Sequence, residues 1–165
     1  MSAPLSFSVN NSGAQLILNG GFESGASKWS ASAGVINKDA SEAARTGAYK
    51  AWLSGVGAVH TDTLAQKITL PASGSALLSF WLRVTSDETA TTAVDTLQVQ
   101  VRSASGAVLA TLATYSNLDK GNAFAQKTLD LSAFKGQTVS LTFVGAENDG
   151  AATSFILDDV SVNVQ

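Results

Sequence analysis

The stretch ALLSFWLRV, residues 76–84, alternates apolar residues with residues of other kinds, and it decides the fold class. Leu78, Phe80, Leu82 and Val84 recur at every second position, which is the period of a β-strand with one buried face. The same period recurs along the chain at 47–54, 63–70, 94–102, 107–113, 126–131, 137–144 and 154–163. Gly, Ser, Asn or Asp residues separate these stretches, and no segment follows a convincing helical period.

Short alternating strands with turns between them predict an all-β fold of two packed antiparallel sheets. Among such β-sandwiches we expect a jelly roll. The segment 131–137, LSAFKGQ, is predicted to hold one helical turn. A length of 165 residues suits one domain. We expect residues 16–165 to form that single module and residues 1–15 to form an N-terminal extension or a first strand.

The composition indicates what the chain binds and where it works. Only 14% of the residues are charged, the net charge is −3, and the ten Lys and Arg residues are scattered. This pattern argues against a nucleic-acid-binding protein. No stretch is long and apolar enough to span a membrane, and the absence of cysteine leaves the redox compartment undetermined. Low charge with many small polar residues is typical of exported bacterial modules, so we expect a secreted protein.

Two carboxylates stand out as a candidate metal site. In FILDDVSV, residues 155–162, strict alternation places Asp158 on the same inward face as Ile156 and Val160. Glu23 follows the Gly-rich turn of LILNGGFESGASKW, residues 16–29, and the terminal strands of a sandwich often lie side by side. A buried carboxylate needs a partner, and Ca²⁺ prefers oxygen ligands. The alternative is that Asp158 accepts hydrogen bonds from backbone N–H groups and Glu23 is solvated.

Alternation also predicts a ligand-binding face. Trp81 and Arg83 point away from the core in 76–84, and we expect that strand to pair with 94–102, which follows it in the chain. One outer sheet would then carry a sugar-binding set of aromatic and planar polar side chains, namely Trp52, Trp81, Arg83, Gln98, Gln100 and Arg102. The alternative is that loops such as 85–95, or residues 1–15, cover Trp52 and Trp81. Trp29 is expected in the core.

Other polar residues give weaker indications. Asp87, Glu88 and Asp95 frame the longest loop, where they would hold a second Ca²⁺ or form a solvated acidic loop. His60 is expected to be a loop residue, because no Cys or second His accompanies it. The sequence has no G-x-S-x-G motif, zinc signature or phosphate loop, so we expect no enzyme activity. A pair of carboxyl groups acting on a glycosidic bond stays open as an alternative.

The segments NGGFE, TGAYKAWLSG, LSFWLRV and SFILDDVSV, with a Trp after the first, occur in an order that resembles the jelly-roll superfamily of carbohydrate-binding modules. The layout also resembles MAM domains and the C-terminal modules of kumamolisin-like and thermolysin-like secreted bacterial peptidases. It covers about residues 16–164. The resemblance implies a structural Ca²⁺ whose ligands match Glu23 and Asp158 here. It also implies a main-chain oxygen ligand near Tyr49 or Lys50, which we assign to Lys50.

These observations lead to three functional hypotheses, of which the third is a stand-alone hydrolase with the pair of carboxyl groups described above. The first is a non-catalytic accessory module of a secreted bacterial enzyme, which binds a polysaccharide or glycan, carries a structural Ca²⁺ and accompanies the catalytic domain of its parent enzyme. The second is a structural or protein-interaction domain of a secreted peptidase or surface protein that does not bind sugar. Exposure of Trp52 and Trp81 would favour the first hypothesis, and burial of both rings would favour the second.

Overall fold

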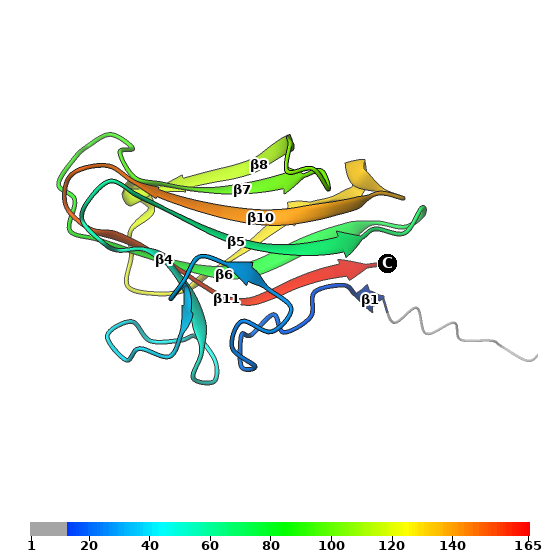
Figure 1. Cartoon of the computed structure of the whole chain (residues 1–165), viewed down its shortest axis with the longest axis horizontal. Coiled ribbons are helices and arrows are strands. Elements are labelled where there is room, and N and C mark those ends of the chain that lie inside the picture. The colour runs from blue at the N-terminus through cyan, green and yellow to red at the C-terminus, as the bar shows by residue number, and fades with distance from the viewer. Residues whose placement is uncertain (1–12) are drawn as a thin grey trace, which may run out of the picture.

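The computed structural model of the chain describes residues 13–165, which form two antiparallel sheets packed face to face (Figure 1). Sheet A has the order β3-β4-β11-β6-β9, with β1 also paired to β11, and sheet B has the order β2-β5-β10-β7-β8. The strands are β1 Ala14–Gln15, β2 Ser30–Ala31, β3 Ile36–Asn37, β4 Lys50–Ser54, β5 His60–Thr69, β6 Ala76–Ser86, β7 Thr96–Arg102, β8 Val108–Ser116, β9 Ala125–Asp130, β10 Thr138–Glu147 and β11 Thr153–Val164. The predicted all-β two-sheet sandwich is confirmed.

Each stretch that the alternation marked as a strand forms one of the longer strands, from β4 to β11. The pattern did not mark β1, β2 and β3, because two residues are too few to show a period. The helical turn predicted within 131–137 is the 3-10 helix η2, Ser132–Phe134, and a second one, η1, spans Asn117–Asp119.

The hydrophobic core lies between the two sheets. Phe80 of β6 and Phe143 of β10 meet edge to face, with ring centroids 5.3 Å apart, which joins the centres of the sheets. The leucines and valines that alternate along β6, β7 and β10 surround this pair. Each strand therefore has an inner face in the core and an outer face available for other roles.

The expected pairing of β6 with β7 is wrong. β6 pairs with β11 and β9 in sheet A, whereas β7 pairs with β10 and β8 in sheet B. The connection between them carries the chain across the sandwich, since Asp87 still bonds to the β11 side through its N–H and the carbonyl of Ala152. Alternation identifies the buried face of a strand, but it does not identify the sheet to which the strand belongs.

The expected direction of Asp158 is also wrong. Phe155 and Leu157 point into the core, so Ile156 and Asp158 lie on the outer face of sheet A, opposite Arg83 and Trp81 of β6. A bulge then shifts the register between Asp158 and Ser161. Asp159 adopts φ 49° in this bulge, which returns the valines that follow to the core face.

The described N-terminal end runs beside the C-terminus (Figure 1). Ala14 and Gln15 of β1 pair with Val164 and Asn163 of β11. The part of the predicted extension at residues 1–12 lies outside the described residues. Within residues 13–165, no helix has the length and hydropathy that crossing a membrane requires.

Candidate functional site

The NGGFE turn is held from inside by its own aromatic residues. Phe22, with φ 62°, is fully buried and packs on Trp29 at a centroid distance of 5.3 Å. Trp29 is in the core as predicted, and its Nε1 donates to the carbonyl of Asn19 at 2.8 Å. The Asn19 side chain in turn donates to the carbonyls of Gly25 and Ser27. Burial of Phe22 therefore fixes where the next residue, Glu23, emerges.

Glu23 and Asp158 both face one short segment, residues 45–49. The N–H groups of Ala48 and Tyr49 donate to Glu23 Oε1 at 3.0 and 2.9 Å. Asp158 Oδ2 accepts from the N–H groups of Arg45 at 2.8 Å and Thr46 at 3.0 Å. Asp158 Oδ1 accepts a third N–H, from Asp159, at 2.8 Å. The backbone hydrogen bonds of the alternative interpretation are therefore present, and they extend to Glu23 as well.

Burial dominates the electrostatics of Asp158. It raises the pKa of this carboxyl, and the N–H groups of Thr46 and Asp159 oppose that shift because they favour the ionised form. Lys50, the third residue of the predicted metal site, is also fully buried, and its Nζ donates to the carbonyl of Asp39. Burial lowers the pKa of the Lys50 ammonium, whereas the nearby charges of Asp39 and Glu42 raise it.

The outer face of sheet A is covered by the segment 38–49. Arg45 lies over the Trp81 ring, with Cζ 3.7 Å from the ring centroid, and its Nη1 forms an ion pair with Asp159 at 2.7 Å. Arg83 forms an ion pair with Glu42 at 2.7 Å and lies over Phe124. Trp81 is outward, as predicted, but Arg45 covers one face of its ring. The covering residue, Arg45, lies in neither of the two segments that were expected to cover the ring, residues 85–95 and 1–15.

Trp52 also lies on the outer side of sheet A, opposite Ile156 of β11. Its ring is partly buried, and within the described chain its Nε1 has no hydrogen-bond partner. The Lys50 ammonium lies 5.6 Å from the centroid of the ring. Sheet A therefore carries Trp52, Trp81 and Arg83. The prediction that they share one face with the polar residues of β7 is wrong, because β7 belongs to sheet B.

The other half of the predicted sugar-binding set forms a row along β7 on the outer face of sheet B. Arg102 Nε donates to Gln100 Oε1 at 2.8 Å, and Gln100 Nε2 donates to Gln98 Oε1 at 2.6 Å. Across the sheet, Ser140 and Thr142 of β10 lie opposite Arg102 and Gln100. The row therefore borders a surface of hydroxyl groups.

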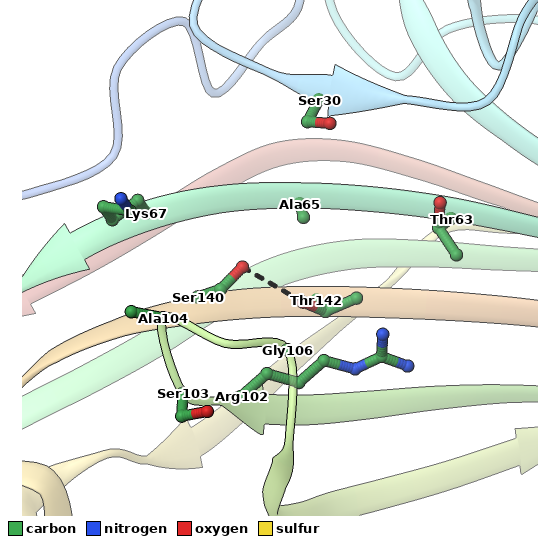
Figure 2. Close-up of a pocket in the computed structure, with 10 residues that line it drawn as sticks. All are labelled: Ser30, Thr63, Ala65, Lys67, Arg102, Ser103, Ala104, Gly106, Ser140 and Thr142. Atoms are coloured by element: carbon green, nitrogen blue, oxygen red, sulfur yellow. Dashed lines mark hydrogen bonds between the residues drawn. The ribbon is translucent and has the colours of Figure 1, made fainter.

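A shallow depression of about 240 Å³ opens on this face, next to the row (Figure 2). Its lining comes from β2, β5, β10, the end of β7 and the turn after β7: Ser30, Thr63, Ala65, Lys67, Arg102, Ser103, Ala104, Gly106, Ser140 and Thr142. Figure 2 shows the Arg102 side chain extending from β7 along β10. We call this site the sheet B depression. Arg102 was predicted from the sequence, whereas the other lining residues were not, since small hydroxyl residues carry no motif.

Neither alternative for Asp87, Glu88 and Asp95, a second calcium site or a solvated acidic loop, describes the contacts of Asp95 and Glu88. Asp95 is fully buried, and it accepts hydrogen bonds from the N–H of Asn148 and the hydroxyl of Thr153. Glu88 instead accepts from the N–H of Ala151. Within residues 13–165, no group of three or more His, Cys, Asp and Glu residues has a metal-binding arrangement. These carboxylates hold the turn between β10 and β11.

His60 is the first residue of β5 rather than a loop residue, and it has a partner. Its Nε2 lies 3.0 Å from Asp62 Oδ2, and the N–H of Ser54 donates to the same oxygen at 2.8 Å. The spacing could have indicated this pair, because residues two apart in a strand share a face. Among the described residues the Ser54 hydroxyl has no hydrogen-bond partner, so it does not bond to His60 or Asp62 as a serine activated by a base would.

No protein-family model and no curated protein sequence matches the chain. Solved structures do match it. The carbohydrate-binding module TmCBM61, solved in complex with β-1,4-galactotriose, is 19% identical with a TM-score of 0.66, and the match covers 92% of this chain and 99% of that one. This chain has the jelly-roll fold of the carbohydrate-binding modules.

Two further structures have the same fold. The second family 16 carbohydrate-binding module is 21% identical with a TM-score of 0.55, over 89% of this chain and 98% of that one. The K3 cleaved adhesin domain of Lys-gingipain from Porphyromonas gingivalis W83 is 18% identical with a TM-score of 0.59, over 90% and 99%. The matches also include enzymes, among them an α-L-arabinofuranosidase. Identities this low establish the fold alone.

Proposed function

We propose that this chain is a non-catalytic accessory module of a secreted bacterial enzyme and that it binds polysaccharide in the sheet B depression. The observation that carries the proposal is the row of Gln98, Gln100 and Arg102 beside a hollowed surface of hydroxyl groups. Planar amide and guanidinium groups and hydroxyls are suited to the hydroxyl groups of a sugar, because they donate and accept in fixed directions. The fold shared with TmCBM61 supports the same reading.

Within residues 13–165, the groups that the sequence offered for catalysis are held in other arrangements, in keeping with a binding role. In the described part of the chain, the Ser54 hydroxyl makes no contact with a base, and Glu23 and Asp158 are both held by backbone N–H groups. The depression has no acidic residue in its lining, so a pair of carboxyl groups at glycosidase spacing is not present there. The low fraction of charged residues supports export, and the fold shared with carbohydrate-binding modules supports a parent enzyme.

The proposed module also carries a structural Ca²⁺ on Glu23, Asp158 and the main-chain oxygen of Lys50. Two features support this assignment. Both carboxylates face the segment 45–49, and carboxylate oxygens are hard donors of the kind that Ca²⁺ prefers. Gly47 of that segment, with φ 62°, leaves room for the Glu23 carboxylate, which any Cβ at this position would strike. The bound ion would neutralise two carboxylates and join the NGGFE turn to β11.

A glycan array with the purified chain, followed by calorimetry on each positive glycan, tests the binding role. Ala104→Trp places a large side chain at the edge of the sheet B depression, from an exposed turn where the fold tolerates it. Ser105→Trp is the matched control, because Ser105 is on the same turn and does not line the depression. We expect Ala104→Trp to abolish binding and Ser105→Trp to retain it.

Absence of binding to any glycan by the folded chain would contradict the proposal. Binding that Ala104→Trp leaves intact, and that Trp52→Ala or Trp81→Ala abolishes, would instead move the site to sheet A.

The second candidate function is a protein-interaction domain, and the edge of sheet B favours it. Within residues 13–165, β8 pairs only with β7. It carries no charged residue, and it exposes Val108 and Leu109 by 52% and 48%. An open, uncharged edge strand is suited to pairing with a strand of another protein. Co-purification of a partner that Leu109→Lys releases, together with an empty glycan array, would support this function.

A further inference from the structure

We propose that the sheet B depression selects an acidic polysaccharide, one whose sugars carry carboxylate or sulfate groups. This inference rests on the proposed polysaccharide-binding function and names its substrate class. It is carried by the distribution of charge around the depression and by the geometry of Arg102.

Arg102 is the one arginine of the sequence whose charge is free in the described structure. The other two form ion pairs at 2.7 Å, Arg45 with Asp159 and Arg83 with Glu42. No carboxylate of residues 13–165 lies within ion-pair distance of Arg102. The fold therefore neutralises the two arginines on the outer side of sheet A and leaves the arginine of sheet B available for a ligand.

Gln100 positions the guanidinium of Arg102 for this role. The Nε–H of Arg102 donates to Gln100 Oε1, and this is the only hydrogen bond that the Arg102 side chain makes within residues 13–165. Gln100 is itself buried and held by Gln98. The two terminal nitrogen atoms therefore remain for a ligand. A planar guanidinium donates two parallel hydrogen bonds to a carboxylate, which a neutral hydroxyl group cannot accept.

Lys67 of β5 supplies a second cation on the same face of sheet B. Ser140 of β10 lies opposite Lys67 of β5 on one side and opposite Arg102 of β7 on the other. Two strand spacings place the two Cα atoms about 10 Å apart. Lys67 also has no carboxylate within ion-pair distance in the described chain. A polymer crossing the depression would meet both cations, with the hydroxyl groups between them.

The rest of this face carries no opposing charge. The outward residues of β5, β10 and β7 include no Asp or Glu. The whole chain has a net charge of −3, so this face differs in sign from the average of the molecule. No aromatic ring lines the depression, so the stacking on which neutral-sugar recognition depends is not offered. The depression therefore offers a ligand its positive charges and its hydrogen-bonding groups, the planar guanidinium among them.

The experiment measures the affinity of the whole chain for polygalacturonate and for the same polymer after chemical reduction of its carboxyl groups. We expect polygalacturonate to bind more tightly, with an affinity that falls as salt is added. Arg102→Gln is expected to weaken binding about tenfold, because it removes a charge-assisted pair, and Lys67→Gln should weaken it less. Lys135→Gln, an exposed charge outside the depression, is the control and should change nothing.

Dextran sulfate forms a second arm that distinguishes the anions. Tighter binding to polygalacturonate assigns the carboxylate, and tighter binding to dextran sulfate assigns the sulfate ester. Equal binding to the reduced polymer, unchanged in Arg102→Gln, would overturn the acidic preference while the polysaccharide-binding function stands. Equal binding to single-stranded DNA would also overturn it. Absence of binding to every polymer would contradict the proposed function itself.

Discussion

Asp158 is a buried carboxylate whose hydrogen-bond donors, within residues 13–165, are backbone N–H groups. Its carboxylate has no exposed surface, yet three backbone N–H groups donate to it. Hydrogen bonds to an ionised group are stronger than neutral ones, so they offset part of the cost of burying the charge. The raised pKa shows that burial is the larger effect. A cation at this point would remove the remaining cost.

We predict that Ca²⁺ raises the melting temperature at about pH 7 and that the rise shrinks toward about pH 4. A carboxylate must be ionised to bind the ion, and the pKa of Asp158 lies above its usual 3.8. At a Ca²⁺ concentration of 100 times Kd the gain is about 2.7 kcal/mol, which is roughly 5–10 °C for a domain of this size. Fluorimetric melting in CaCl₂ and in EDTA across this pH range measures it.

In the metal-free protein, the contribution of Asp158 to stability should change with pH in the opposite direction to the effect of Ca²⁺. Because the folded-state pKa of Asp158 is raised, its contribution to stability is fully present below pH 3.8 and is lost as pH rises through the folded-state pKa. Glu23→Gln should remove most of the effect of Ca²⁺, and Asp87→Asn, on an exposed loop residue, should leave it unchanged. Coincident melting curves in CaCl₂ and EDTA at about pH 7 would contradict the metal assignment.

β11 is the element on which the candidate metal site depends, and its bulge decides which way Asp158 points. Asp159 has φ 49° at the bulge. Its carboxylate accepts a hydrogen bond from the Thr46 hydroxyl at 2.8 Å and pairs with Arg45. The bulge therefore ties β11 to the segment 45–49, the same segment whose N–H groups hold Asp158. A regular strand at this position would separate Asp158 from the N–H groups of the segment 45–49.

We predict that Asp159→Ala lowers the free energy of unfolding by about 1–3 kcal/mol, because alanine does not tolerate this backbone region and makes neither contact. Asp159→Asn should cost less, since asparagine tolerates a positive φ and can still accept from Thr46. Urea denaturation at equilibrium measures both. If the alanine variant unfolds at the same urea concentration as the parent, the conformation of the bulge is not a source of strain.

The elements also show what alternation can and cannot predict. It found the strands from β4 to β11 because each has a clear period of two. It failed at Asp158 because one inserted residue reverses every face beyond it. A signal was present, since the apolar pairs Phe155–Leu157 and Val160–Val162 are out of phase, but Ile156 concealed it.

The candidate site was predicted in halves for a related reason. The outward direction of Arg102 and of Trp81 follows from their own strands, and both directions are confirmed. That they lie on opposite sheets depends on the connection between β6 and β7, which local pattern does not describe. The cover of Trp81 by Arg45 depends on a contact between residues 36 positions apart. Such contacts follow from the tertiary fold, and the sequence carries no local signal for them.

The two ends of the sandwich carry different groups. The sheet B depression lies at the Ser140 end of β10, beside the turn after β7. At the opposite end of β10, Glu147 is 5% exposed and accepts from the N–H groups of Val56, Gly57 and Thr153. Glu147 therefore closes one end of the fold, away from the surface proposed to bind polysaccharide.

We predict that Glu147→Gln lowers the free energy of unfolding by about 1–3 kcal/mol and leaves the Kd for polysaccharide at 25 °C unchanged. The amide NH₂ would face a backbone N–H and leave a buried donor without an acceptor, at the end of β10 away from the sheet B depression. Asp149→Asn, an exposed residue in the turn after Glu147, is the charge-matched control and should change neither quantity. Urea denaturation and calorimetry on the same preparations measure both. A weaker Kd in Glu147→Gln with unchanged stability would contradict this division, because it would show that the closed end is coupled to the sheet B depression.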